Sequence, residues 1–259
     1  MYESRITHLL TFAVVAVLAS AVRFPDAIAQ SWTYRVASQP LIRNISAFAN
    51  NPVAGTNTLI VSTLTDGMYT GADTSAGTTW QKISTGIPIV QVRSHAVISA
   101  NPVTDIYAAT EGAGVYKTVN GGTGWTAING SGAGELGCLD VRSVAVTKTT
   151  VPRTLLVSTS CRNNSGVYQS VDDGINWTRV GPLPPLANAL PLDVQSNGVT
   201  RHGTTTSLWF LATLNYGVFM SNNAGATWTA ANNGLPAGGS IFGVTFSGAT
   251  SGNTTDLLT

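Results

Sequence analysis

Three arginines recur at one position of a repeated segment. Arg43, Arg93 and Arg142 each follow a branched aliphatic residue and lie 50 and 49 residues apart, and Gln195 takes the same position one copy later. A guanidinium group binds a carboxylate or sulfate through parallel hydrogen bonds, so arginines on neighbouring copies would converge on one anion. We therefore predict that these four residues bind an anionic group of a ligand. The alternative is that each arginine only forms an ion pair with a neighbouring carboxylate.

Two aspartates lie beside this position. Asp140 and Asp193 precede it by two residues, which places them on the strand face that Arg142 and Gln195 share. Carboxylates on adjacent copies that lie ~6.5 to 9.5 Å apart have the separation found in inverting glycosidases. Asp140 and Asp193 are therefore the candidate catalytic residues, and an ion-pair role beside the arginines is the alternative.

The tryptophans set the length of the repeat. Intervals of 48, 45, 52 and 51 residues separate Trp32, Trp80, Trp125, Trp177 and Trp228. Each period contains four short strand patterns, of which the third is Gly-apolar-aromatic and the fourth begins at the tryptophan. Such units are typical of β-propeller blades. We predict an all-β propeller with blades at about 41–86, 90–130, 139–182 and 192–234, and a partial blade at 240–259.

The two ends of the sequence predict an incomplete ring. Ser31-Trp32-Thr33 matches Asn176-Trp177-Thr178, so residue 30 onward starts with the last strand of a blade. The sequence stops within the second strand of a fifth unit, which gives about 4.5 blades, whereas propellers have about four to eight. The pattern favours the N-terminal part of a larger propeller or a truncated gene product.

Residues 1–29 have the pattern of a secretory signal peptide. Arg5 and His8 precede an apolar run over residues 9–22, and Ala27-Ile28-Ala29 follows it. The run is short for a membrane span, and no later run is long and apolar enough for one. We expect cleavage after Ala29 and a secreted, periplasmic or extracellular domain of residues 30–259. An uncleaved N-terminal anchor is the alternative.

An exported chain can hold a disulfide, and this chain has two cysteines. Cys138 precedes the strand pattern at 141–147, and Cys161 follows the one at 154–160. If these strands pair in an antiparallel hairpin, the start of the first lies beside the end of the second. We predict a disulfide between Cys138 and Cys161, with two buried free thiols as the alternative.

The turn between the third and fourth strands repeats a fixed chemistry. In its fullest copy, which starts at Ser170, Asp172 can cap backbone N–H groups, Gly174 can take a positive φ angle, and Trp177 can fill the gap between blades. The same structural positions in the other copies are Asn120, Gly122 and Trp125, then Asn223, Gly225 and Trp228, then Gly77 and Trp80.

This turn resembles the Asp-box, or BNR repeat (S/T-x-D-x-G-x-T-W), of the sialidase-like propeller superfamily. Asparagine replaces the aspartate in two copies, and the first copy has a two-residue insertion with Ser75 at that position. The resemblance covers nearly all of the chain after residue 29. It implies that these turns have a structural role and lie on the face away from any active site.

Three kinds of Asp-box propeller are similar to this sequence in style. A sialidase would need an arginine triad and a tyrosine nucleophile, and neither Tyr34 nor Tyr216 has an obvious catalytic setting. A xyloglucanase-like resemblance rests on the aspartate pair and the style of the blades. The non-catalytic assembly factors of photosystem II are similar in repeat style, and they carry an arginine patch.

Composition excludes some classes of function. Charged residues make up only 10% of the chain and the net charge is +1, so no nucleic-acid partner is expected. His95 and His202 have no second ligand at a suitable spacing, so we expect neither a metal site nor a cofactor. We predict an exported, non-catalytic propeller that binds a protein partner or a carbohydrate at the channel mouth. The alternative is a glycoside hydrolase of sialidase-like or xyloglucanase-like type.

Overall fold

The computed structural model describes most of the repeat region. The described residues are 42–51, 56–73, 79–88, 91–98, 104–147, 152–161, 164–180, 196–202, 208–213, 216–235, 241, 245–246 and 257–258. The predicted signal peptide, Trp32, and the site residues Gly77, Asp193 and Gln195 lie outside the described residues.

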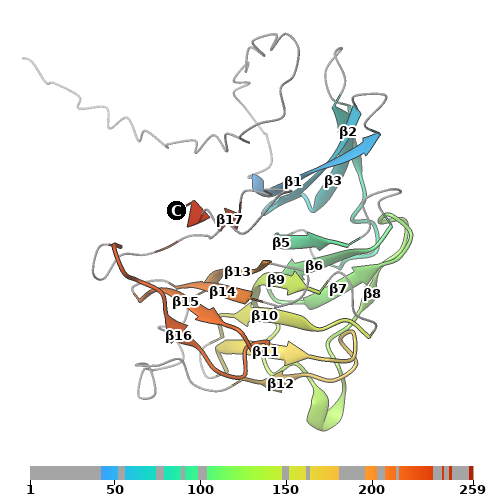
Figure 1. Cartoon of the computed structure of the whole chain (residues 1–259). Helices are drawn as coiled ribbons and strands as arrows, with labels where there is room; N and C mark the ends of the chain where they lie inside the picture. Colours follow the sequence, from blue (N-terminus) through green and yellow to red (C-terminus); the bar gives the residue numbers. More distant parts are fainter. Residues whose placement is uncertain are drawn as a thin grey trace, which may run out of the picture.

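Four antiparallel sheets of four strands follow one another along the chain, each with its strands in chain order (Figure 1). Sheet 1 contains β1 (Ile42–Asn51), β2 (Thr56–Thr63), β3 (Met68–Asp73) and β4 (Trp80–Lys82). Sheet 2 contains β5 (Val92–Val97), β6 (Ile106–Thr110), β7 (Gly114–Thr118) and β8 (Thr126–Ala127). Sheet 3 contains β9 (Val141–Val146), β10 (Leu155–Thr159), β11 (Gly166–Ser170) and β12 (Thr178–Arg179). Sheet 4 contains β13 (Ser196–His202), β14 (Leu208–Thr213), β15 (Gly217–Ser221) and β16 (Thr229–Ala230).

Two smaller elements complete the description. The strands β17 (Thr245–Phe246) and β18 (Leu257–Leu258) pair with each other after sheet 4. One 3-10 turn, η1 (Gly132–Gly134), lies between β8 and β9. The sheets therefore match the predicted all-β architecture with a partial fifth unit.

The first strand of each sheet lies innermost. β1 contacts β5, β5 contacts β9, and β9 contacts β13, whereas the fourth strands are two or three residues long and exposed. The first strands therefore line a common axis, and the sheets are arranged around it as propeller blades.

Neighbouring sheets bury their apolar faces against each other. The core between sheets 2 and 3 contains Tyr107 and Val115 from one side and Val144, Val157 and Trp177 from the other. All five residues of β10 are buried, as expected for a strand that is covered on both faces. A single sheet of this kind has no means of burying both faces, so the blades stabilise one another.

Each second strand ends at a threonine that marks the start of the next connection. Its hydroxyl donates to the carbonyl oxygen of the glycine that precedes or begins the third strand. The threonines are Thr63, Thr110, Thr159 and Thr213, with donor to acceptor distances of 2.7 to 3.1 Å. Because this bond recurs in all four sheets, it marks equivalent positions at the ends of their second strands.

The two ends of the sheets carry different connections. At one end the first strands begin and the second strands connect to the third; we call this the mouth end. At the opposite end, which we call the turn end, lie the connections from first to second and from third to fourth strands. Antiparallel pairing in chain order requires this alternation.

The turn-end loops repeat one hydrogen-bond pattern. Asp172 Oδ1 accepts a bond from Asn176 N at 2.9 Å, and Gly174 N donates to Ser170 Oγ at 2.8 Å. Gly174 has a φ of 90°, which an L side chain rarely adopts. The loops around Asn120 and Asn223 contain equivalent bonds at 2.8 to 3.0 Å.

Two of the turn tryptophans connect neighbouring sheets. Trp125 Nε1 donates to Ile83 O at 2.6 Å, and Trp177 Nε1 donates to Ile128 O at 2.7 Å. Trp80 instead is 42% exposed, because no described sheet precedes sheet 1. The expectation that the tryptophan fills a gap between blades is therefore wrong for Trp80 within the described part of the chain.

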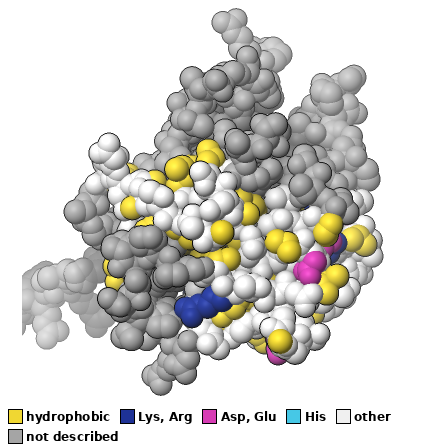
Figure 2. All heavy atoms as spheres, turned by 60° about the horizontal axis from the view of Figure 1, so that its bottom comes forward, with side chains coloured by type: hydrophobic (Ala, Val, Ile, Leu, Met, Phe, Trp, Pro, Cys, Tyr) yellow, Lys and Arg dark blue, Asp and Glu magenta, His cyan; other side chains and the backbone are white. Residues whose placement is uncertain are grey.

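The surface carries few charges. Figure 2 shows one face, on which hydrophobic side chains are scattered and few side chains are charged, in keeping with the low content of charged residues. None of the described residues belongs to a helix with the length and hydrophobicity needed to cross a membrane.

Candidate functional site

The arginine position is a point of irregular strand pairing. In sheet 2, Val92 pairs with Thr110 and Ser94 pairs with Ala109, so Arg93 between them has no partner in the strand register. The register shifts in the same way at Arg43 in β1 and at Arg142 in β9. A β-bulge re-aims the side chain of its extra residue, and bulges are common beside functional sites.

The bulge in sheet 4 corrects one sequence prediction. Thr213 pairs with Ser196, and the next pair begins at Gly198, so Asn197 holds the bulge position. Gln195, predicted to be equivalent to Arg142, lies two residues earlier in the chain. A shift of two residues keeps every side chain on its face, so hydrophobic alternation does not reveal it.

The same shift removes the predicted equivalence of the two aspartates. The residue two positions before the bulge is Asp140 in sheet 3 and Gln195 in sheet 4, whereas Asp193 lies further upstream. The pair that suggested an inverting glycosidase therefore does not arise from equivalent positions of neighbouring blades.

Arg93 and Arg142 each form an ion pair with a carboxylate. Arg142 Nη2 lies 3.0 Å from Asp140 Oδ2, as the alternative to anion binding had anticipated. Arg93 Nη2 pairs with Glu111, which follows β6 directly. The side chains of the two arginines are 16% and 21% exposed and that of Asp140 is 23% exposed, whereas Glu111 is 35% exposed, so the pair with Asp140 is the better shielded from water.

The two ion pairs form one cluster across sheets 2 and 3. Glu111 and Asp140 pair through their backbones as an isolated antiparallel bridge. Burial lowers the pKa of Arg93, and the positive charge of Arg142 lowers it further. Burial raises the pKa of Asp140, although both arginines oppose that shift. We call Arg93, Glu111, Asp140 and Arg142 the mouth cluster.

The mouth cluster has unused hydrogen-bonding capacity. Among the described residues, Arg93 Nε, Arg142 Nε and Asp140 Oδ1 are buried atoms with no hydrogen-bond partner. A buried donor or acceptor left unsatisfied costs about 1–3 kcal/mol. An anion that accepts from the two Nε–H donors would remove their share of that cost, and a water molecule could bond to any of the three atoms.

Arg43 differs from the other two arginines. It occupies the bulge of β1, but its side chain is exposed, and no ion pair connects it to another described residue. The three predicted arginines thus share a backbone position, whereas only Arg93 and Arg142 share a cluster.

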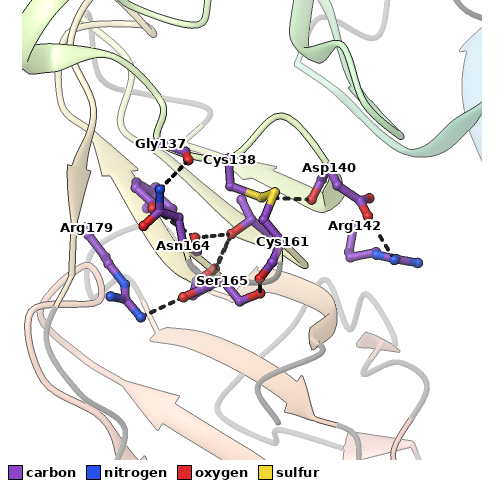
Figure 3. The surroundings of a disulfide bond; sticks show 11 residues. Gly137, Cys138, Asp140, Arg142, Cys161, Asn164, Ser165 and Arg179 are labelled. Carbon is purple, nitrogen blue, oxygen red and sulfur yellow. Dashed lines mark hydrogen bonds and ion pairs between the residues drawn. A yellow bond between two sulfur atoms is a disulfide. The ribbon is translucent and has the colours of Figure 1, made fainter. Parts of the chain in front are cut away.

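A disulfide supports the backbone beside the mouth cluster (Figure 3). Cys138 and Cys161 are joined, with their Cα atoms 5.8 Å apart, and this bond links the entry to β9 with the connection that follows β10. Asp140 O accepts a bond from Ser160 N at 2.9 Å, and Asn164 Nδ2 donates to Gly137 O at 3.0 Å. Asp140 therefore lies on a segment that is held from both sides.

Sequence comparison missed Glu111. It has no acidic counterpart after the second strands of the other sheets, where Leu64, Ser160 and Leu214 follow the threonine. A search for residues that recur in every copy does not detect such a position. The sequence did contain one signal for Glu111: it directly follows the second strand of its blade, which ends beside the start of the first strand, where Arg93 lies.

The remaining predicted sites have structural surroundings. The residues Asp172, Asn120 and Asn223 lie at the turn end, away from the mouth cluster. His95 is buried in β5, and burial lowers its pKa to about 4. The described part of the chain contains no group of three or more His, Cys, Asp or Glu suited to a metal ion.

Comparison with known proteins identifies the fold. No protein-family model and no curated protein matches the chain. Among solved structures, an ancestral GH74 enzyme is 16% identical with a TM-score of 0.50, and the match covers 73% of this chain and 24% of the enzyme. The GH74 xyloglucanase from Xanthomonas campestris is 13% identical with a TM-score of 0.50, covering 73% of this chain and 32% of the enzyme. YCF48 bound to D1 peptide is 11% identical with a TM-score of 0.45, covering 73% and 54% of the two chains.

The chain thus spans 24% and 32% of the lengths of the two enzymes. Identities this low carry information about the fold and not about activity, because one fold supports many functions. The strand order, the blade stacking and these similarities together establish that the chain folds as a β-propeller.

Proposed function

We propose that this chain is an exported, non-catalytic propeller that binds an anionic group of a protein or carbohydrate partner at its mouth end. Arg93 and Arg142 are the principal contacts, and Arg43 extends the site toward sheet 1. The third-to-fourth strand turns act as Asp-box turns that hold the blades. Export is an expectation from the sequence of residues 1–29.

One observation carries this proposal: three consecutive first strands have a bulge at an arginine. Nothing in strand pairing requires arginine at a bulge, and a long cationic side chain is expensive to bury. Repetition of the same residue type at three re-aimed positions is best explained by a shared ligand.

The unpaired hydrogen-bond donors of the mouth cluster suit an anion rather than a cation as the ligand. Both Nε atoms of the mouth cluster are donors without a described partner, and a guanidinium has no acceptor atom. The half-buried ion pairs already hold the two arginines in fixed positions, so binding orders few additional side chains.

Sodium sulfate is a suitable probe for this site. We expect a calorimetric titration of the full chain at constant ionic strength to show saturable binding of sulfate. Arg93→Gln combined with Arg142→Gln removes the saturable response. Arg153→Gln is the matched control, because Arg153 is also shielded and paired, with Asp105 at the turn end. A response that survives the double substitution overturns the proposal.

A glycoside hydrolase is the second candidate, and one observation favours it. Asp140, with its raised pKa, faces a second carboxylate, Glu111, across the backbone bridge. A raised pKa suits a general acid. Glycan release by the full chain that is lost in Asp140→Asn would support the hydrolase, and no release by the unaltered chain would reject it.

A further inference from the structure

We propose that Asp140 is a built-in competitor at the anion site, so that acidification opens Arg142 to an oxyanion that keeps its charge in acid, such as a sulfate ester. This inference rests on the proposed function and adds its regulation and the chemical class of its ligand.

The geometry makes Asp140 an occupant of the site. Its Oδ2 lies 3.0 Å from Arg142 Nη2, which is where an external carboxylate or sulfate oxygen would bind. The second oxygen, Oδ1, is buried without a described partner. Asp140 is only 23% exposed, so the pair is not one that water and salt readily replace.

The charges around Asp140 come from two sheets. Arg142 lies on the same strand entry, and Arg93 and Glu111 approach from sheet 2. With both acids ionised, the four described groups sum to zero charge, so an incoming anion gains little attraction. Protonation of Asp140 leaves these four groups with a net charge of +1 and frees the Nη2 atom of Arg142 from its ion pair.

The environment of Asp140 favours its protonation at a higher pH than that at which an ordinary aspartate is protonated. Burial raises its pKa, and Glu111 raises it further, while the two arginines only partly oppose this. Because the folded pKa lies above the ordinary value, the neutral form populates at a higher pH than an exposed aspartate allows.

The backbone does not need to move for this exchange. Asp140 O accepts from Ser160 N at 2.9 Å, its backbone pairs with Glu111, and the disulfide joins Cys138 to Cys161. None of these interactions involves the carboxyl group. Protonation therefore changes the charge of the site without breaking the interactions that hold its backbone.

The class of ligand follows from which anions keep their charge at the acid pH that neutralises Asp140. An external carboxylate has a pKa of roughly 3.3 to 4.3 and loses its own charge as the solution becomes acidic. A sulfate ester is a far stronger acid and stays ionised. It is therefore the class that benefits fully when Asp140 becomes neutral.

Sulfate affinity measured against pH tests this inference. Because the pKa of Asp140 lies above its ordinary value, we expect the full chain to bind sodium sulfate up to about tenfold more tightly near pH 4 than near pH 7, the gain of roughly one charge-assisted hydrogen bond. Asp140→Asn should bind near neutral pH as tightly as the unaltered chain does in acid, with little dependence on pH. The matched control is Asp105→Asn, which removes a shielded, arginine-paired carboxylate at the turn end.

The outcomes separate the two proposals. Sulfate binding that is saturable but equal at both pH values overturns the competitor role of Asp140 and leaves the anion site intact. Absence of binding at either pH, in the unaltered chain and in Asp140→Asn, overturns the anion site itself. If Asp140→Asn does not fold, the pH profile of the unaltered chain still decides the question.

Discussion

Asp172 shows how one side chain holds a turn-end loop. Its Oδ1 accepts from the backbone of Asn176 at 2.9 Å, and its Oδ2 accepts from the Asn176 side chain at 2.7 Å. These bonds lower the pKa of Asp172, the backbone bond most strongly. Asn120 and Asn223 keep the Oδ1 bond without a charge.

Asp172→Asn should make stability less dependent on pH. Because the folded pKa of Asp172 is lower than its unfolded pKa, the carboxylate stabilises the fold above the unfolded value. That contribution is lost as the pH falls through the folded pKa. In urea unfolding we expect Asp172→Asn to be less stable by under about 1 kcal/mol near neutral pH, and this difference should shrink as the pH falls below the ordinary range of an aspartate. A difference of the same size at neutral and at acid pH contradicts this assignment.

Gly174 is required for two separable reasons. Its φ is 90°, and a Cβ atom there would lie 2.7 Å from the Cβ of Ile128 in sheet 2. Gly234 has a φ of 87°, but a Cβ atom added to it would meet no atom within 4 Å beyond its chain neighbours. Gly234→Ala should cost about 1–2 kcal/mol from backbone strain alone. Gly174→Ala should cost at least about 1 kcal/mol more, from the clash. If urea unfolding shows that the two variants lose the same free energy of unfolding, the clash with Ile128 does not contribute.

At the scale of elements, the connections at the mouth end are tied across sheets. Leu139 O accepts bonds from Gly112 N at 3.0 Å and Gly114 N at 2.9 Å. The entry to β9 thus pairs with the connection that leaves β6. The disulfide then joins that same entry to the connection that leaves β10. The mouth cluster therefore lies between two fixed connections.

Removing the disulfide should destabilise the domain by roughly 3 kcal/mol, since its sequence separation is 23 residues. Cys138→Ser combined with Cys161→Ser tests this in urea unfolding at neutral pH. A reductant should lower the stability of the unaltered chain to that of the double variant and leave the variant unchanged. If the two proteins unfold at the same urea concentration, the disulfide has no part in stability.

For the whole molecule, contacts between sheets fix the relative positions of the blades. Tyr107 OH donates to Asp173 Oδ1 at 2.6 Å, and Arg153 Nη2 lies 3.2 Å from Asp105 Oδ2. Both interactions join sheet 2 to sheet 3 at the turn end. Since the two arginines of the mouth cluster belong to these sheets, the contacts also set the distance between them.

The tryptophans should differ in importance according to their neighbours. Trp177→Phe loses the bond to Ile128 O and leaves a gap between sheets 2 and 3, so we expect a loss of about 2 kcal/mol. Trp80→Phe changes an exposed side chain and should cost less than about 0.5 kcal/mol. Urea unfolding of the full chain measures both. A large effect at Trp80 would mean that another segment covers it.

The sequence by itself determined the repeating unit. Strand length, turn residues and the spacing of Trp125, Trp177 and Trp228 are local properties, so they predicted four-stranded blades and the bonds made by Asp172. The position of Cys138 before one strand and Cys161 after its neighbour followed from the same local order.

Tertiary structure decided what depends on distance between blades. The ion pair between Arg93 and Glu111 involves an acid that no other copy shares. The shift from Gln195 to Asn197 is invisible to alternation because it preserves the strand face. A repeat fixes each blade through local interactions, but charges at the axis come from several blades, and only their packing brings Arg93 and Arg142 into one cluster.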